Sequence, residues 1–144
     1  MNNIDEKILF ASSYSFIGIL EELLKFHESE KCIDSFGNTP LIIASQLGNT
    51  AVVKLLLSRS TKPKEYVGIR NKGGISAVDW AISKNYVDIL EILLLNGYDY
   101  VESPYNIKRY KNKEAYKLFV KFFIFDLLKS KVPIQIANDL VNYL

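Results

Sequence analysis

The feature that most constrains the fold is the stretch 37–57, which combines turn, cap and apolar-helix signals in a fixed order. Gly37 suits a tight turn because glycine reaches positive φ at no steric cost, and Thr39 followed by Pro40 suits the start of a helix. Gly48 then suits a left-handed helix end. The residues after it predict a second helix too apolar to stand alone in water, so this unit needs a neighbour on each flank.

The order of residues in this stretch closely resembles an ankyrin repeat, and the chain carries more than one copy. The first clear copy reads Gly-Asn-Thr-Pro-Leu-Ile-Ile-Ala from Gly37 and Gly-Asn-Thr-Ala-Val-Val-Lys-Leu-Leu-Leu from Gly48, with Thr50 as the expected cap of the second helix. The next copy includes Gly-Ile-Ser-Ala-Val-Asp-Trp-Ala from Gly74 and Ile-Leu-Glu-Ile-Leu-Leu-Leu from Ile89. The resemblance implies an all-α ankyrin-repeat solenoid of stacked antiparallel helix pairs with hairpin-like loops.

Single positions within the two copies depart from the family pattern. The histidine that usually follows Thr-Pro-Leu is Ile42 in the first copy and Asp79 in the second, which leaves the hydrogen bonds around the turn open. Ser76 takes the place of threonine as helix cap. We expect Asp79 and Asp88 to face solvent. Trp80, the only tryptophan, is expected to pack in the core, with a binding hot spot as the alternative.

The repeats divide a single domain into four parts. Ala11 lies thirty-three positions before Ala44, so we interpret the first part as a divergent repeat, with helices expected at 4–12 and 16–26. A terminal cap of this kind needs a polar outer face. The expected parts are an N-terminal capping repeat at 1–33, a repeat with a loop insertion at 34–70, a repeat at 71–102 and a divergent helical C-terminal cap at 103–144.

Two segments are longer or more apolar than the family pattern requires. Ala44 and Ala81 are thirty-seven residues apart, which places about four extra residues between 58 and 68. This insertion is either a flexible loop or an extra partner contact. Near the end of the chain, 111–129 predicts a long helix covered on several sides, and Pro133 can begin a final helix.

Side chains that could catalyse a reaction or hold a metal are scarce. His27 is the only histidine and Cys32 the only cysteine, so a serine triad, a histidine-assisted thiol and a zinc site all lack members. We therefore expect no enzyme, no cofactor and no metal. The single cysteine also excludes an internal disulfide and favours a reducing compartment, in which Cys32 is expected to be an inert, partly buried thiol.

Charge and hydropathy restrict the remaining partners. The net charge is only +2, so we interpret the basic, tyrosine-containing run 105–113 as the solvent-exposed side of a helix. Nucleic acid is therefore not expected as a partner. No apolar run reaches the roughly 20 residues of a membrane span, and no signal peptide is recognisable. We expect a cytoplasmic protein, or one in a host cytosol if it is a secreted effector or a viral protein.

The resemblance implies a protein–protein interaction module whose concave surface, made of hairpin tips and first-helix ends, binds another protein. Carried over position by position, the tip residues are Ser35, Phe36, Asn38, Lys72, Gly73 and Ile75, and the helix-end residues are Gln46, Leu47, Ser83 and Lys84. Phe36 and Ile75 are expected to be exposed, because their side chains have no local folding purpose. Compact proteins of this family act as inhibitors, as immunity proteins opposing a toxin, or as pathogen effectors.

Two other functions stay open. Residues 132–144 faintly resemble the opening helix of an F-box, which would make the chain a ubiquitin-ligase adaptor, although the usual glutamate is missing. The Phe-rich helix within 111–129 and the acidic-to-basic change along the chain would suit self-assembly. Such a structural protein would form a homo-oligomer through its C-terminal helices.

Overall fold

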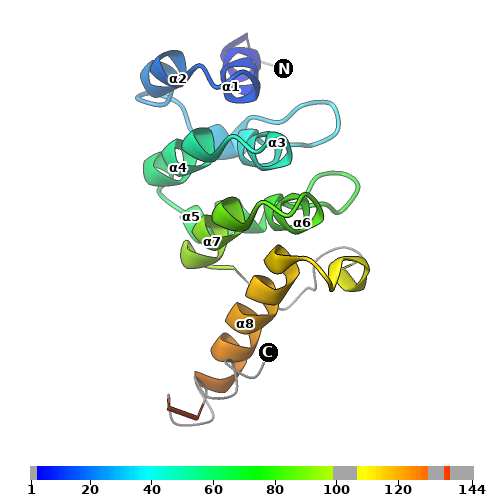
Figure 1. Ribbon diagram of the computed structural model, residues 1–144. Helices are drawn as coiled ribbons and strands as arrows, with labels where there is room; N and C mark the ends of the chain where they lie inside the picture. Colours follow the sequence, from blue (N-terminus) through cyan, green and yellow to red (C-terminus); the bar gives the residue numbers. More distant parts are fainter. Residues whose placement is uncertain (1–2, 99–106, 130–134, 137–144) are drawn as a thin grey trace.

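The computed structural model describes residues 3–98, 107–129 and 135–136, and it shows helix pairs stacked side by side (Figure 1). The first helices of the pairs are α1 (Asn3–Ser13), α3 (Pro40–Leu47) and α6 (Ala77–Ser83), and the second helices are α2 (Ile17–Leu23), α4 (Thr50–Arg59) and α7 (Val87–Leu95). Each set forms a column, and the loops before α3 and α6 project beyond the column of first helices. The expected all-α solenoid is confirmed.

The start and end of α3 follow the expected signals. Thr39 precedes the helix, and its hydroxyl oxygen accepts a hydrogen bond from the backbone N–H of Ile42 at 3.3 Å. Pro40 takes the first helical position, where a missing N–H leaves no bond unmade. Gly48 ends the helix with a φ of 76°, a left-handed conformation that glycine adopts without strain.

The start of α4 differs from the prediction. Thr50 lies inside the helix, and the cap is Asn49, whose side chain makes no bond to the helix that follows it. The Asn49 amide instead donates to the backbone oxygens of Ser12 and Ser13, at 3.2 and 3.3 Å. These carbonyl groups end α1 and have no partner further along their own helix. Asn49 therefore links the second repeat to the first.

The core runs through the whole stack and is made of residues that the repeats share by position. In the central repeat the fully buried side chains include Leu41, Ala44, Val52, Val53 and Leu56, each 0% exposed. They are covered because the central pair has a helix pair on each side (Figure 1). Helices this short are marginal alone, so burial of these side chains against neighbouring repeats supplies most of their stability.

The outer face of the first helix pair carries exposed apolar side chains beside exposed polar ones, whereas a terminal cap was expected to be polar there. Ile19 occupies the position that Val52 has in the next repeat, yet Ile19 is 56% exposed while Val52 is fully buried. Phe16 and Phe26 are also exposed. Val52 has the first helix pair beside it, whereas the described residues include no pair on the other side of Ile19.

The inserted residues form a short helix and not a flexible loop, so that prediction is wrong. Helix α5 (Pro63–Gly68) begins with its proline at the first position and contacts both α4 and α6. Tyr66 is 1% exposed and Val67 is fully buried. The insertion is therefore part of the core.

The long helix expected near the end of the chain is α8 (Glu114–Lys129), which follows the short η2 (Ile107–Tyr110). Ala115 and Phe119 are buried where α8 meets α6 and α7. Further along, α8 extends away from the stack (Figure 1), and Phe123 is exposed. The expected cover on several sides is therefore not provided by the residues that the structure describes.

Within residues 3–98, 107–129 and 135–136, no helix is long and apolar enough to cross a membrane. The junction at 103 and nearly all of the F-box-like segment 132–144, residues 135–136 excepted, lie outside the described residues.

Candidate protein-binding surface

The first hairpin, residues 34–38, is held by the side chain of Asp34. Its Oδ1 accepts hydrogen bonds from the backbone N–H groups of Phe36 and Asn38, at 2.8 and 2.9 Å. Gly37 closes the turn with a φ of +77°. Phe36 lies at the tip with 69% of its surface exposed, as the sequence predicts, so its ring is accessible to a partner.

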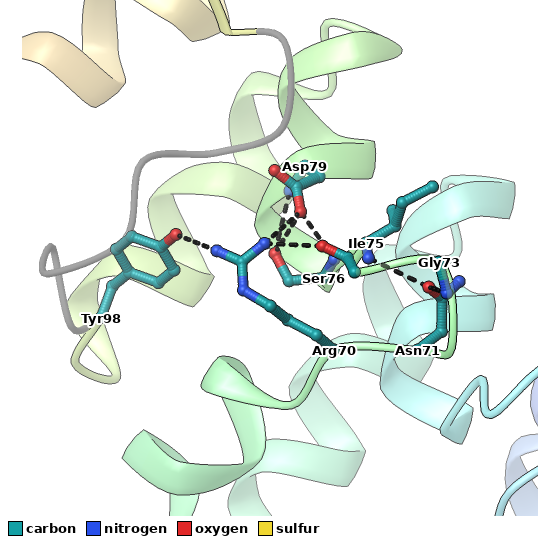
Figure 2. A network of polar contacts seen from close by, with 8 residues as sticks. Arg70, Asn71, Gly73, Ile75, Ser76, Asp79 and Tyr98 are labelled. Carbon is teal, nitrogen blue, oxygen red and sulfur yellow. Dashed lines mark hydrogen bonds and ion pairs between the residues drawn. The ribbon is translucent and has the colours of Figure 1, made fainter.

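The second hairpin, residues 70–76, repeats this arrangement with an amide in place of the carboxylate (Figure 2). Asn71 Oδ1 accepts hydrogen bonds from the backbone N–H groups of Gly73 and Ile75, at 2.9 and 3.0 Å. Gly74 has the same positive φ as Gly37, which lets the chain turn back toward α6. Both hairpins therefore owe their shape to an Asp or Asn side chain placed three residues before a glycine.

A charged network joins the second hairpin to α6 (Figure 2). Asp79 Oδ2 accepts hydrogen bonds from the backbone N–H and the hydroxyl group of Ser76, at 2.7 and 3.0 Å. Arg70 forms an ion pair with the same carboxylate at 3.2 Å, and donates to the Gly74 carbonyl at 2.8 Å and the Tyr98 hydroxyl at 3.4 Å. Asp79 is only 6% exposed, so the prediction that it faces solvent is wrong. It completes a capping box with Ser76.

The two hairpin tips are also tied to each other. The Lys72 backbone N–H donates to the carbonyl oxygen of Phe36 at 3.0 Å, and Lys72 Nζ donates to that of Ser35 at 2.9 Å. The Asn71 amide donates to the Asn38 side-chain oxygen at 2.8 Å. Asn38 and Lys72, both predicted to bind a partner, thus also hold the tips in register.

The first helices present a row of apolar side chains on their exposed side. We call this side of α1, α3 and α6, together with the tips 35–38 and 72–75, the first-helix surface. Leu47, the last residue of α3, is 51% exposed, and Tyr14, thirty-three positions earlier, is 63% exposed. Phe10 lies one turn before Tyr14 and is 55% exposed, and the two ring centres are 4.6 Å apart.

Phe16 completes this group, with its ring centre 5.9 Å from that of Phe10 and 6.1 Å from that of Tyr14. The three rings and Leu47 are named the apolar end of the surface. The rings are absent from the set of binding residues that the sequence predicts. The signal that could find Tyr14 is the repeat spacing itself, since the offset that aligns Ala11 with Ala44 also aligns Tyr14 with Leu47.

The other end of the first-helix surface, at α6, is basic. Lys84 Nζ lies 5.9 Å from the ring centre of Trp80. Lys113 Nζ donates to the Ser83 carbonyl oxygen at 2.7 Å and lies 5.3 Å from the ring centre of Tyr110. Contacts with carbonyl groups and rings position these ammonium groups without neutralising them. The cationic end of the surface is defined by Lys72, Lys84 and Lys113.

A small pocket of about 120 Å³ lies beside the cationic end and is lined by Ile75, Asp79, Trp80, Ser83 and Tyr110. Ile75 is partly buried, so the expectation of an exposed tip at this position is wrong. Trp80 packs against the core, as expected, and also lines the pocket. Its indole N–H is buried and has no hydrogen-bond partner among the described residues.

The predicted binding residues differ in how accessible the structure leaves them, although all lie on the hairpins or near the ends of α3 and α6. The exposed ones are Ser35, Phe36, Leu47, Lys72, Gly73 and Lys84, and the partly buried ones are Asn38, Gln46, Ile75 and Ser83.

Reactive groups are not assembled elsewhere in the described part of the chain. Cys32 is 1% exposed and its Sγ donates to Asp5 Oδ1 at 3.3 Å. Burial, helped by the Asp5 carboxylate, raises the pKa of Cys32 to about 12, so the thiol stays protonated and unreactive at neutral pH. Within the same residues, no three His, Cys, Asp or Glu side chains are placed to hold a metal ion.

Comparison with known proteins identifies the repeats. The nuclear factor NF-kappa-B p105 subunit of Gallus gallus is 28% identical to this chain over 81 residues, which is 56% of this chain and 8% of that protein. The family model for ankyrin repeats matches residues 8–103 as three copies, in agreement with the pairs α1–α2, α3–α4 and α6–α7. Ankyrin repeats are in general protein–protein interaction modules and not catalytic domains. The chain belongs to the ankyrin-repeat family.

Proposed function

We propose that this chain binds another protein through its first-helix surface. The observation that carries the proposal is the row of exposed apolar side chains found there: Phe10, Tyr14, Leu47 and Phe36, each between 51% and 69% exposed. Burying one such side chain against a partner contributes about 1.5–3 kcal/mol. Aromatic anchors of this kind dominate the energy of protein interfaces.

The rigidity of the hairpins supports the same proposal. The side chains of Asp34 and Asn71 each fix a turn through two backbone N–H groups, and Lys72 ties one tip to the other. A surface whose loops are already ordered loses less conformational entropy when a partner docks. Phe36 is thus presented on a preorganised support.

The proposed activity is the binding itself. A small module that covers part of a partner blocks that part, which is how an inhibitor, an immunity protein or a pathogen effector works. The proposal places the chain in the cytoplasm, or in a host cytosol, with its one cysteine, buried and protonated, as the supporting observation.

Site-specific photo-crosslinking tests the proposal. A benzophenone amino acid replaces Phe36 in one variant and Leu95, on α7, in the control, because both side chains are 69% exposed. Illumination in extracts of the source cells should give a discrete adduct from position 36 and none from position 95. Adducts from position 95 alone would place the interface on the second helices and contradict the proposal.

A second proposal, self-assembly through the C-terminal helices, is supported by Phe123 of α8, a large apolar side chain that is 37% exposed. Light scattering over a range of concentrations tests it. A rising mean mass that Phe123→Ser abolishes would support it, and a monomer at every concentration would rule it out.

A further inference from the structure

The two ends of the first-helix surface differ in chemistry, and this difference specifies the partner. We propose that the surface takes a polypeptide segment with apolar side chains at one end and acidic side chains at the other. The apolar part lies on α1 and α3, and the acidic part lies on α6. This inference rests on the proposed protein-binding function and adds the class and direction of the bound segment.

The apolar end offers a continuous area for large side chains. The rings of Phe10, Tyr14 and Phe16 lie within 6.1 Å of one another, centre to centre. Each is more than two-fifths exposed, and the next repeat adds Leu47, which is 51% exposed. Clustered apolar side chains at the surface of a soluble domain mark an interaction site more often than single ones do.

The cationic end offers positive charge that no carboxylate among the described residues neutralises. Lys72, Lys84 and Lys113 hold their nitrogen atoms near carbonyl oxygens or aromatic rings. None of the three forms an ion pair with a carboxylate among the described residues. The nearest buried carboxylate, Asp79, is already engaged by Arg70 and Ser76. An acidic segment would therefore meet uncompensated ammonium groups here.

The difference in charge between the two ends fixes the direction. At the apolar end Glu6 and Lys7 are both exposed, four and three residues before Phe10 on α1, so their charges offset each other. An acidic segment placed over α1 would therefore gain no net attraction. Over α6 the same segment meets three lysines that no carboxylate of the described residues neutralises. The binding mode with apolar groups on α1 and acidic groups on α6 is thus favoured over its reverse.

Separation of the exposed ring cluster from the lysines argues against single-stranded nucleic acid as the occupant. Such ligands bind where aromatic rings and basic side chains alternate along one groove, so that bases stack while phosphates are neutralised. Here the clustered rings of Phe10, Tyr14 and Phe16 lie on the first repeat, while the rings beside the lysines, Trp80 and Tyr110, are both partly buried. A polypeptide matches this two-part surface better.

Selection from a random peptide library displayed on phage, against the intact chain, tests the proposal without assuming a partner. Enriched sequences are then made as fluorescent peptides, together with versions in which Asp and Glu are replaced by Lys. We expect enriched sequences with two or three large apolar residues beside an acidic cluster. The acidic form should bind about tenfold tighter than its lysine counterpart, and this ratio should shrink as salt is added.

Two variants and one matched control test which end of the first-helix surface binds which part of the peptide. Lys84→Glu should weaken the acidic peptide about tenfold, and Tyr14→Ser should weaken acidic and lysine forms alike. Lys54→Glu changes an exposed lysine on α4 and should leave binding unaltered. Trp80 is the only tryptophan and lines the pocket beside Lys84, so its emission should shift when the acidic peptide binds.

The outcomes separate this inference from the proposed function. Enriched peptides without acidic residues that still depend on Tyr14 would overturn the inference and leave the proposed function standing. Peptides that bind both surface variants as well as the control, or no enrichment at all, would contradict both. A single-stranded oligonucleotide that binds and displaces the acidic peptide at physiological salt would also overturn the inference, with nucleic acid as the occupant.

Discussion

Asp79 shows how one carboxylate can fix both a helix start and a loop. Its Oδ2 serves Ser76 as helix cap and Arg70 as ion-pair partner, and Arg70 in turn reaches Gly74 and Tyr98. Removing the Asp79 carboxylate would take away its ion pair with Arg70 and its two hydrogen bonds from Ser76 at a largely buried site, where lost polar contacts cost most. Asp79 thus adds to the stability of the second hairpin, whose turn is held separately by Asn71.

The first prediction measures the contribution of Asp79. Asp79→Ala should lower the free energy of unfolding by about 1–3 kcal/mol, because it removes a capping box and the ion-pair partner of Arg70. Asp88→Ala is the control, since Asp88 lies in the first turn of α7 but is exposed. Urea unfolding followed by circular dichroism measures both. Equal, small effects of the two substitutions would mean that the network contributes little.

Phe36 is expected to contribute to partner binding but not to the stability of the fold. Phe36→Ala should weaken the complex with the captured partner while leaving the melting temperature nearly unchanged, because the ring is 69% exposed and the turn is held by Asp34. Leu95→Ala, equally exposed on α7, should change neither. Titration calorimetry measures the affinity, and scanning calorimetry measures the melting temperature. A large drop in melting temperature for Phe36→Ala would make the ring a folding residue.

Cys32 makes stability depend on pH in the alkaline range. The pKa of its thiol is raised to about 12 in the folded protein, mainly by burial, against about 8.5 in an unfolded chain. Its stabilising contribution is therefore complete below about pH 8.5 and is lost as pH rises toward 12, because only the unfolded chain releases the proton in that window.

Denaturant titrations at pH 7.5 and pH 10 test this third prediction. The wild type should lose more stability between the two values than Cys32→Ala, which removes the thiol and serves as the reference for all other groups. Equal losses in the two proteins would show that the thiol pKa is not raised. Ellman's reagent should also react slowly with the native protein at pH 8 and rapidly once urea unfolds it.

At the scale of elements, local signals predict the helix ends well where the deciding partner is close in sequence. Thr39, Pro40 and Gly48 act within one helix, and all three behave as predicted. Asn49 is different, because its side chain serves the last carbonyls of α1, more than thirty residues earlier. The sequence marks Thr50 as the cap because it cannot show that the neighbouring helix competes for Asn49.

The insertion at α5 illustrates the same limit. Repeat spacing reveals the extra residues between Ala44 and Ala81 but not the space they fill. Tyr66 and Val67 are buried only because α4 and α6 leave room for them when the second and third repeats stack. Composition alone, with a proline between two lysines, favours a loop.

The fourth prediction concerns this element. Tyr66→Ala should destabilise the protein by about 3–5 kcal/mol, the usual cost of emptying a large aromatic site in a core. Glu65→Ala, the exposed neighbour, should change stability by less than about 0.5 kcal/mol. Chemical denaturation resolves such a difference easily. If Tyr66→Ala hardly changed the free energy of unfolding, the insertion would be a flexible loop and not part of the core.

For the whole molecule, the binding surface is only partly predictable because it is assembled from repeats of unequal regularity. The hairpin residues are recognised through their glycines, which the first repeat lacks. Phe10 and Tyr14 are therefore overlooked, although they stand where Ile43 and Leu47 stand in the next repeat. Ile75 looks exposed in the sequence, but it is partly buried in the structure, where it lines a small pocket together with Trp80 and Tyr110.

Stacking of repeats also determines how many helices a destabilising core substitution affects. Each helix pair contacts the pairs beside it, as in other solenoids, so stability is a sum of repeat terms and interface terms. Ile8, in the first pair, and Leu56, in the central pair, are both 0% exposed. Truncating either to alanine should cost about 2–5 kcal/mol locally. What differs is the number of interfaces that depend on the altered repeat.

The fifth prediction uses this difference. Ile8→Ala should release mainly α1 and α2, so their amide hydrogens should exchange faster while those of α3, α4, α6 and α7 stay protected. Leu56→Ala should raise exchange across all of these helices, because the central pair supports a neighbour on each side (Figure 1). Hydrogen exchange read by mass spectrometry resolves the individual helices. A uniform increase in both variants would mean that the stack unfolds as one cooperative unit, with interfaces stronger than the repeats they join.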